Sequence, residues 1–119
     1  MTPTECKVEY TTNAGDKFLL RVEIPEYYPA EMPSTYVEFP KPLLKKNGDL
    51  IKGYSSSFHT YGDKNGEPRI CVGRPDAFDE SETIYYVLIK SFTWLEALSQ
   101  HWVTGKDLGE YLSDQPRKP

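Results

Sequence analysis

The second half of the chain carries one long apolar stripe at helical spacing. Within residues 83–102, TIYYVLIKSFTWLEALSQHW, apolar or small side chains recur at alternating steps of four and three residues. This is the period of an amphipathic α-helix. The stripe consists of Ile84, Leu88, Ser91, Leu95, Leu98 and Trp102, and it is widened by Tyr85, Ile89 and Phe92. A helix with so broad an apolar face must pack against another layer of structure, which constrains the rest of the chain.

The first half of the chain predicts that second layer. Residues 7–12, 18–24 and 34–39 alternate apolar and polar side chains, as half-buried strands do. Turn residues at 13–16 join the first two strands into a hairpin, and a fourth short strand is expected at 50–54. The expected fold class is therefore α+β, with an antiparallel four-stranded meander sheet backed by the long C-terminal helix.

The chain length fits one domain. A chain of 119 residues can bury one core but is too short for two, and it contains no internal repeat or linker. We therefore expect a single domain over residues 1–119. Gly105 should end the long helix, residues 106–112 should form a second short helix capped by Thr104, and 113–119 should be a disordered tail.

Composition narrows the partners and the location. The net charge is −4 and the basic residues are scattered, so no nucleic-acid partner is expected. No apolar run reaches the roughly 20 residues that span a bilayer, and no signal peptide is recognisable, so we expect no membrane partner and a cytoplasmic location. The positions of the cysteines and histidines, Cys6, His59, Cys71 and His101, fit no compact ligand pattern. We expect no metal and no cofactor.

Residues 59–83, HTYGDKNGEPRICVGRPDAFDESET, interrupt these patterns and are expected to form a loop around Cys71. Arg69 and Arg74 flank this cysteine, and nearby positive charge favours the reactive thiolate. A cysteine on a loop held by a rigid scaffold is a candidate nucleophile. The alternative is that Cys71 is buried and fills space as a small apolar residue, as cysteines usually do.

Two further residues in this stretch are candidates for a supporting role. His59 is either a general base or a histidine that braces the loop through hydrogen bonds of its ring. Asp76 is a candidate to orient an attacking amine or to take its proton. The alternative is that it caps the helix and the turn before it. His101 is expected at the end of the long helix, where a cation is favoured, while Trp102 is expected in the core. Cys6 is given no role.

These segments together resemble the ubiquitin-conjugating enzyme family. Residues 24–33, IPEYYPAEMP, and 35–39, TYVEF, are similar to the family stretch F-P-x-x-Y-P-x-x-P-P-x-V-x-F. A histidine, a glycine and then Ile-Cys follow in the family, as His59, Gly66 and Ile70-Cys71 do here. A helix that opens T-I-x-x-V-L comes next, as at residues 83–88. The resemblance covers roughly residues 8–112.

The resemblance implies a thioester enzyme. Cys71 would take an activated C-terminal glycine as a thioester and pass it to an amine, usually that of a lysine. Because the first strand is expected near residue 7, we expect the family's leading helix to be absent, as in bacterial stand-alone members such as the conjugating proteins of CBASS anti-phage operons. Those members imply a cGAS-like nucleotidyltransferase or a ubiquitin-like modifier as the acyl donor, and a separate activating enzyme as a possible further partner. The family's oxyanion-stabilising asparagine has no counterpart, since Thr60-Tyr61 replaces its Pro-Asn, which leaves Asn65 or Tyr61 as candidates.

A partner surface is expected within the proline-rich segment 25–33. Tyr27, Tyr28 and Met32 should leave apolar surface fit for docking, unless they only seal the edge of the sheet. The alternative function is a non-catalytic, ubiquitin-binding or scaffold variant of the same fold. Such variants lack the cysteine, whereas Cys71 is in its expected place here. A cysteine hydrolase is disfavoured because the sequence offers no well-placed pair of histidine and acid.

Overall fold

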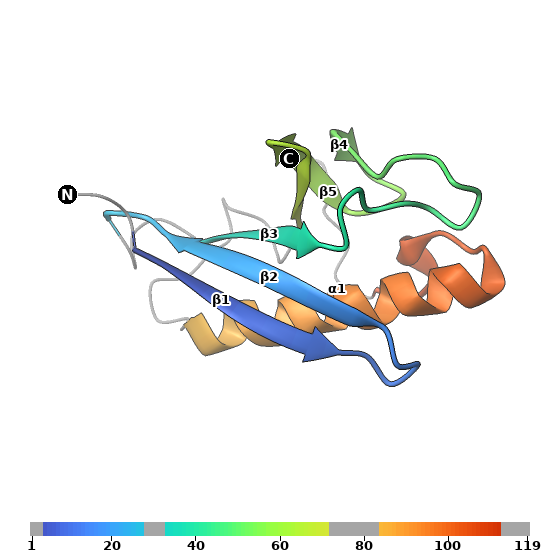
Figure 1. Ribbon diagram of the computed structural model, residues 1–119, viewed down its shortest axis with the longest axis horizontal. Helices are drawn as coiled ribbons and strands as arrows, with labels where there is room; N and C mark the ends of the chain where they lie inside the picture. The colour runs from blue at the N-terminus through green and yellow to red at the C-terminus, as the bar shows by residue number, and fades with distance from the viewer. Residues whose placement is uncertain (1–3, 28–32, 72–83, 113–119) are drawn as a thin grey trace.

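The computed structural model describes residues 4–27, 33–71 and 84–112. Within them the chain forms a six-stranded antiparallel sheet, one long α-helix and a short 3-10 helix (Figure 1). The elements are β1 (Thr4–Thr11), β2 (Lys17–Ile24), β3 (Ser34–Phe39), β4 (Tyr54–Ser55), β5 (Thr60–Lys64), β6 (Glu67–Ile70), α1 (Ile84–Thr104) and η2 (Leu108–Glu110). The α+β class expected from the sequence is confirmed, but the expected number of four strands is wrong. The expected tail at 113–119 lies outside the described residues.

Strands β1, β2 and β3 form the regular part of the sheet. β1 and β2 pair from Thr4 opposite Ile24 to Thr11 opposite Lys17, and β3 pairs along the other side of β2. The alternating apolar residues point into the core, where Leu20 and Val22 are completely buried. The three strands expected from alternation are therefore confirmed, within a few residues at their ends.

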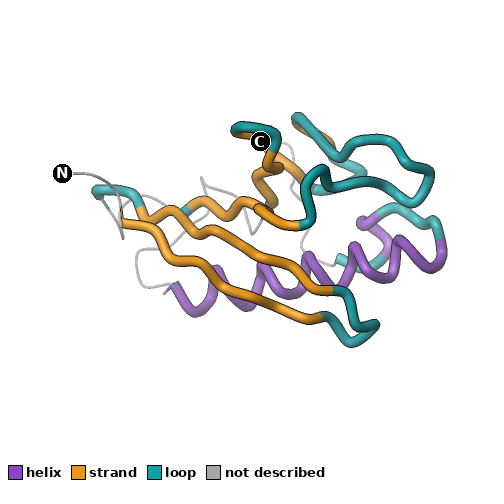
Figure 2. The backbone as a smooth tube through the Cα atoms, viewed as in Figure 1, coloured by secondary structure: helices purple, strands orange, loops and turns teal. Residues whose placement is uncertain are grey.

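The other three strands reach the sheet by a different path. After β3 the chain crosses to the far edge at β4 and returns through β5 to β6, which lies beside β3 (Figure 2). The strand order is β1-β2-β3-β6-β5-β4, so the sheet is not a simple meander. The fourth strand expected at 50–54 is wrong, because Leu50 forms only an isolated bridge to Leu44 and β4 begins at Tyr54.

The stretch expected to be a loop from residue 59 is a hairpin up to residue 70. β5 and β6 are joined by Asn65 and Gly66, whose φ angles of 54° and 79° are both positive. Two positive φ angles are what a two-residue type I′ hairpin turn requires, and Asn-Gly is its preferred sequence. The Asn-Gly pair marks this turn in the sequence, but Gly62 and Pro68 interrupt the alternation of the flanking strands.

Helix α1 covers one face of the sheet (Figure 1). Ser91, Leu95 and Leu98 are buried, as the stripe predicted, and they share the core with Trp94 and Val87. The predicted widening of the stripe is wrong at two positions, since Tyr85 is 69% exposed and Ile89 is 42% exposed. The helix meets the sheet on one side only, so side chains around the flank of the stripe face outward.

The helix ends where the sequence predicted, but the next element is shorter. Gly105 adopts a φ of 80° and donates its N–H to the carbonyl of His101 at 2.7 Å, which is a left-handed C-terminal cap. The second helix expected over 106–112 is only the 3-10 turn η2. Asp107, not Thr104, occupies its N-cap position.

Ion pairs cover the part of the sheet around Arg21. Its side chain lies 2.5 Å from both Glu38 and Glu67 and 3.0 Å from Glu23, and the residue is only 8% exposed. These four residues come from β2, β3 and β6, so the pairs tie together both parts of the sheet. The hydrogen bond from Arg21 is the main reason that the pKa of Glu38 lies below its usual value.

Candidate active site around Cys71

Cys71 lies at the point where the sheet ends. It is the first residue after β6, and its backbone N–H donates to the carbonyl of His59 at 2.8 Å. This bond adds one more contact to the β5–β6 ladder beyond the pair Thr60–Ile70. The residue is 8% exposed. Its backbone is therefore fixed by the sheet, more firmly than the expected loop would have held it.

A bulge in β5 brings Tyr61 next to this cysteine. Thr60 lies opposite Ile70 and Gly62 lies opposite Arg69, so Tyr61 is an extra residue of β5 relative to β6. A bulge bends the strand locally and re-aims the side chain of the extra residue. The Tyr61 hydroxyl lies 3.3 Å from the Cys71 sulfur, within hydrogen-bonding distance of the thiol.

The environment keeps the Tyr61 hydroxyl protonated. Burial raises the pKa of Tyr61 most, and the hydrogen bond and charge of Cys71 raise it further. The Arg69 guanidinium, 5.4 Å from the centre of the Tyr61 ring, acts in the opposite direction and is outweighed. As a thiol, Cys71 donates its hydrogen bond to the tyrosine oxygen. As a thiolate it would accept a hydrogen bond from the same hydroxyl, which stabilises the reactive form.

Tyr54 is a neighbour of this site that the sequence reasoning missed. It lies opposite Tyr61 in the β4–β5 pair, with 6.5 Å between the ring centres. For the pairing of β5 with β6, the Asn-Gly turn at 65–66 was the available signal in the sequence, because a hairpin built on it places residues 60–64 beside 67–70. The bulge then shifts the register, and Gly62 is its local signal, because a glycine within a strand often marks a bulge.

His59 is joined to Cys71 through its main chain. It is 1% exposed, and its φ of 54° lies in the left-handed region that residues other than glycine seldom adopt. Such a conformation persists only where surrounding structure holds it, and it is common near functional sites. The bond from the Cys71 N–H to the His59 carbonyl supports a bracing role through the backbone.

The structure does not bring Asn65 to Cys71. Asn65 forms the hairpin turn at the opposite end of β6, and four strand residues at about 3.3 Å each place it on the order of 15 Å away. Asp76 lies outside the described residues, as do Tyr28 and Met32 of the expected partner surface. Tyr27 is 66% exposed, as a docking residue should be.

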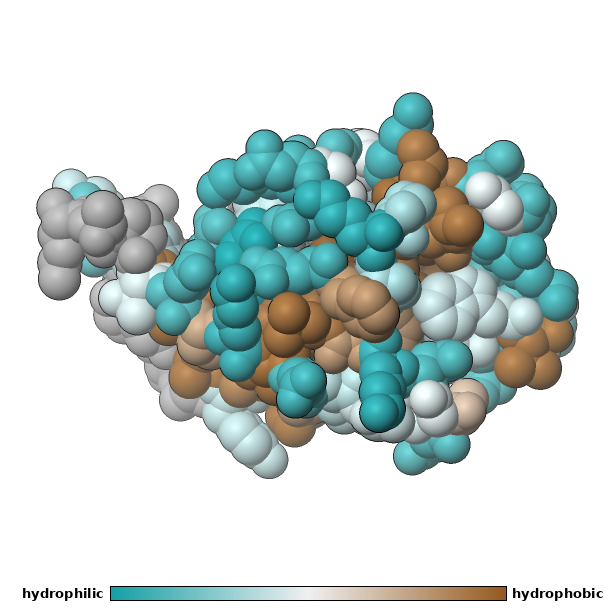
Figure 3. Space-filling view, viewed as in Figure 1, coloured by the Kyte–Doolittle hydropathy of each residue, from teal (hydrophilic) through white to brown (hydrophobic). Residues whose placement is uncertain are grey.

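The rest of the exposed apolar surface is spread over several elements. In Figure 3 hydrophilic side chains surround smaller hydrophobic patches on the face shown. Large exposed apolar side chains elsewhere in the described chain include Phe39, Leu50, Tyr54 and Val103. Scattered apolar residues are normal for a protein surface, so Tyr27 alone does not define a docking site.

Cys6 differs from Cys71 in its surroundings. It lies in β1, is partly buried and packs against the apolar core, and both cysteines are free thiols. Among the described residues no group of three or more histidine, cysteine or acidic side chains is placed to hold a metal ion. No helix in the same part of the chain is long and apolar enough to cross a membrane.

Comparison with known proteins gives no relative. The chain matches no protein-family model, and no curated protein or solved structure is significantly similar to it.

Proposed function

We propose that the chain is an acyl transferase of the ubiquitin-conjugating type, with Cys71 as the residue that forms the thioester. The hydrogen bond between the Cys71 sulfur and the Tyr61 hydroxyl carries this proposal. A cysteine that only fills space in a core behaves as a small apolar residue and needs no polar partner. Cys71 instead has a hydroxyl that a bulge in β5 aims at its sulfur.

The proposed reaction has two steps. In the first, the Cys71 thiolate attacks the carbonyl carbon of an activated C-terminal glycine; a C–S bond forms, and the bond to the activating group breaks. In the second, an amine attacks the thioester carbonyl; a C–N bond forms, the C–S bond breaks, and the amine loses a proton to solvent or to a nearby base. The thiolate leaves and is ready for another cycle. A thioester is already activated, so positioning and stabilisation of the oxyanion suffice.

Tyr61 is the residue proposed to assist both steps. Its protonated hydroxyl can donate to the thiolate before attack and to the negative oxygen that develops at the adjacent carbonyl carbon. The family asparagine with that second role has no counterpart in this sequence, and Asn65 is too remote to replace it. Removing one oxyanion donor typically slows an enzyme by about 100-fold to 1,000-fold.

The ubiquitin-conjugating fold and the partners are part of the same proposal. Supporting features are the β1–β3 meander, a cysteine directly after the sheet and a long helix that begins at Ile84. The return of β6 to lie beside β3 departs from the expected four-stranded meander. The motif resemblance proposes a cGAS-like nucleotidyltransferase or a ubiquitin-like modifier as the donor of the glycine, an activating enzyme, and a cytoplasmic role in bacterial antiviral defence.

Purification from cells that co-express the neighbouring genes tests the proposal. Intact-protein mass spectrometry should show an adduct on the wild type that excess thiol or hydroxylamine removes, because both take the acyl group from a thioester. Cys71→Ala should abolish the adduct, whereas Cys6→Ala, the matched control, should retain it. An adduct that persists in Cys71→Ala would refute the assignment. A partner that co-purifies equally with wild type and Cys71→Ala, with no adduct on either, would instead favour the non-catalytic binding variant.

A further inference from the structure

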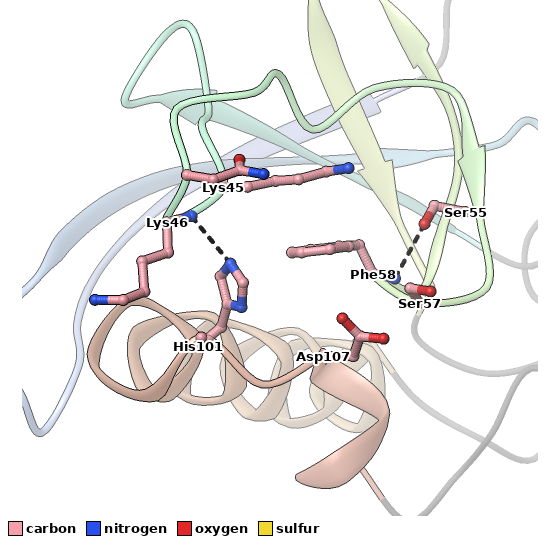
Figure 4. Close-up of a pocket in the computed structure, with 9 residues that line it drawn as sticks. Lys45, Lys46, Ser55, Ser57, Phe58, His101 and Asp107 are labelled. Atoms are coloured by element: carbon pink, nitrogen blue, oxygen red, sulfur yellow. Dashed lines mark hydrogen bonds between the residues drawn. The ribbon is translucent and has the colours of Figure 1, made fainter.

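A hollow of about 510 Å³ lies away from Cys71, between the loop 43–49, the segment 55–58 and the end of α1 (Figure 4). Its volume is within the range of small-molecule sites. The side chains that matter for its chemistry are Lys45, Ser55, Ser57, Phe58, His101 and Asp107. Neither Cys71 nor Tyr61 lines it, so the hollow is separate from the proposed active site.

His101 fixes the inner wall of this hollow. Its Nε2 accepts a hydrogen bond from the backbone N–H of Lys46 at 3.0 Å, and its Nδ1 lies 2.7 Å from the carbonyl of Lys106. Since Nε2 accepts, Nδ1 carries the proton that it donates to that carbonyl. His101 lies in the last turn of α1, where the sequence placed it. Its ring joins the loop to the end of α1.

Other hydrogen bonds fix the remaining walls. The Ser55 hydroxyl accepts from the N–H of Phe58 at 3.1 Å, and the N–H of Leu108 donates to the carbonyl of Ser57 at 3.1 Å. Trp94 donates its Nε1–H to the carbonyl of Phe58 at 2.9 Å. The three segments are thus tied to one another before any ligand arrives, as in a pre-formed site.

Two opposite charges face the hollow without forming an ion pair. The Lys45 ammonium lies 4.9 Å from the centre of the Phe58 ring, and Asp107 lies on the other side of that ring in Figure 4. Asp107 occupies the N-cap position of η2, yet its side chain makes no capping hydrogen bond. Within residues 4–27, 33–71 and 84–112, neither Lys45 nor Asp107 has an ion-pair partner.

We propose that this hollow binds a zwitterionic ligand of the amino-acid and peptide class. Its carboxylate would meet the Lys45 ammonium and the hydroxyls of Ser55 and Ser57, and its ammonium group would meet the Asp107 carboxylate. A simple anion would face Asp107, and a simple cation would face Lys45, so each would meet one repulsive charge. A ligand with both charges pairs with both walls and gains two charge-assisted contacts.

An NMR titration tests this inference without reference to the thioester. The backbone amides of Lys46 and Phe58 lie in the walls and serve as reporters. Alanyl-alanine should shift both with a dissociation constant on the order of 1–10 mM, about tenfold tighter than acetate or methylammonium. A blocked peptide, acetyl-Lys-Gly-Glu-amide, distinguishes between two sources of the ligand. Binding of this peptide indicates an internal protein segment. If alanyl-alanine binds and the blocked peptide does not, the ligand is a free amino acid or a chain end.

Charge-neutral variants complete the test. Lys45→Met and Asp107→Asn should each weaken dipeptide binding about tenfold. Lys52→Met and Glu26→Gln neutralise one exposed charge each outside the hollow and should leave dipeptide binding unchanged. Reporter amides that stay fixed up to about 50 mM dipeptide would overturn the proposal. So would acetate that binds as tightly as the dipeptide, or control variants that weaken binding as much as the hollow variants.

Discussion

Strands β1–β3 and strands β4–β6 share one sheet but differ in regularity. β1 and β2 each have eight residues and pair along their whole length, whereas β4 has two residues and β6 has four. The second group also contains the bulge at Tyr61 and left-handed residues at His59 and Asn65. Long regular pairing makes a stable scaffold, and irregular backbone aims particular side chains. The candidate chemistry is found in the irregular group.

The largest loss of stability is expected from a substitution at Trp94, through which α1 contacts the segment before the irregular strands β5 and β6. Trp94 is completely buried and its Nε1–H donates to the carbonyl of Phe58, just before β5. Trp94→Ala should lower the free energy of unfolding by about 3–5 kcal/mol, because it removes a large core side chain and leaves a cavity. Urea denaturation measures this loss.

A milder variant at the same position tests whether the two groups of strands differ in local stability. Trp94→Phe keeps most of the volume but leaves the Phe58 carbonyl without this donor, which should cost about 1–3 kcal/mol. Hydrogen exchange should then accelerate more at amides of β5 and β6 than at those of β1 and β2. Equal acceleration in both groups would show that the sheet opens as one unit and would contradict the difference between the two groups.

Two tyrosines with raised pKa values contrast the two groups of strands. Tyr10 in β1 donates to Glu96 at 2.6 Å, and this bond is the main cause that raises its pKa to about 12, from the usual 10.0. The stability that this raised pKa contributes is fully present below pH 10.0 and is lost as pH rises through about 12. For Tyr61, burial is the main cause.

Glu96→Gln should therefore move the two tyrosines differently. It removes the charged acceptor, so the pKa of Tyr10 should fall from about 12 toward 10.0, while the titration of Tyr61 should stay unchanged. Ultraviolet titration of tyrosinate, with Tyr10→Phe to identify the signal, measures the shift. Glu9→Gln is the control, since Glu9 neighbours Tyr10 but does not appear among the causes of its shift. A Tyr10 pKa that stays near 12 in Glu96→Gln would contradict this assignment.

Tyr61→Phe should have the smallest effect on stability and a selective effect on Cys71. Loss of one hydroxyl that bonds the thiol should change the free energy of unfolding by about 1 kcal/mol or less. The thiolate loses a hydrogen-bond donor, so alkylation of Cys71 at neutral pH should slow about threefold to tenfold. Tyr54→Phe keeps the ring beside Tyr61 and serves as control. An unchanged alkylation rate in Tyr61→Phe would leave the hydroxyl with a packing role only.

The regular part of the fold could be predicted from the sequence. Alternation identified the strands that bury Leu20 and Val22, and the helical period identified the positions of Leu95 and Leu98 in the core. The Asn-Gly turn at 65–66 was also visible. These features depend on neighbours in sequence or on a simple period, which is the information that a single chain displays.

The contacts that define the sites depend on distant residues and could not be predicted. A bulge of one residue decides that Tyr61 meets Cys71, and Gly62 indicates a bulge in the sequence without fixing its register. His101 bonds the backbone of Lys46, which is 55 residues away in sequence. Only the fold brings such groups together. The resemblance to a known family gave the importance of Cys71 and left Asn65 and Tyr61 as candidates, and the fold places Tyr61 beside the sulfur.

Transfer from a synthetic thioester tests the central claim most directly, because it needs no knowledge of the natural partner. The protein is mixed with a short peptide whose C-terminal glycine is a thioester, and peptide mapping locates the acyl group over time. The account predicts that acyl accumulates on Cys71 faster than on Cys6, that Tyr61→Phe slows this step and that Cys71→Ala abolishes it. Acyl transfer to Cys6 at a rate equal to or higher than that to Cys71, or no acyl transfer to Cys71, would contradict the account.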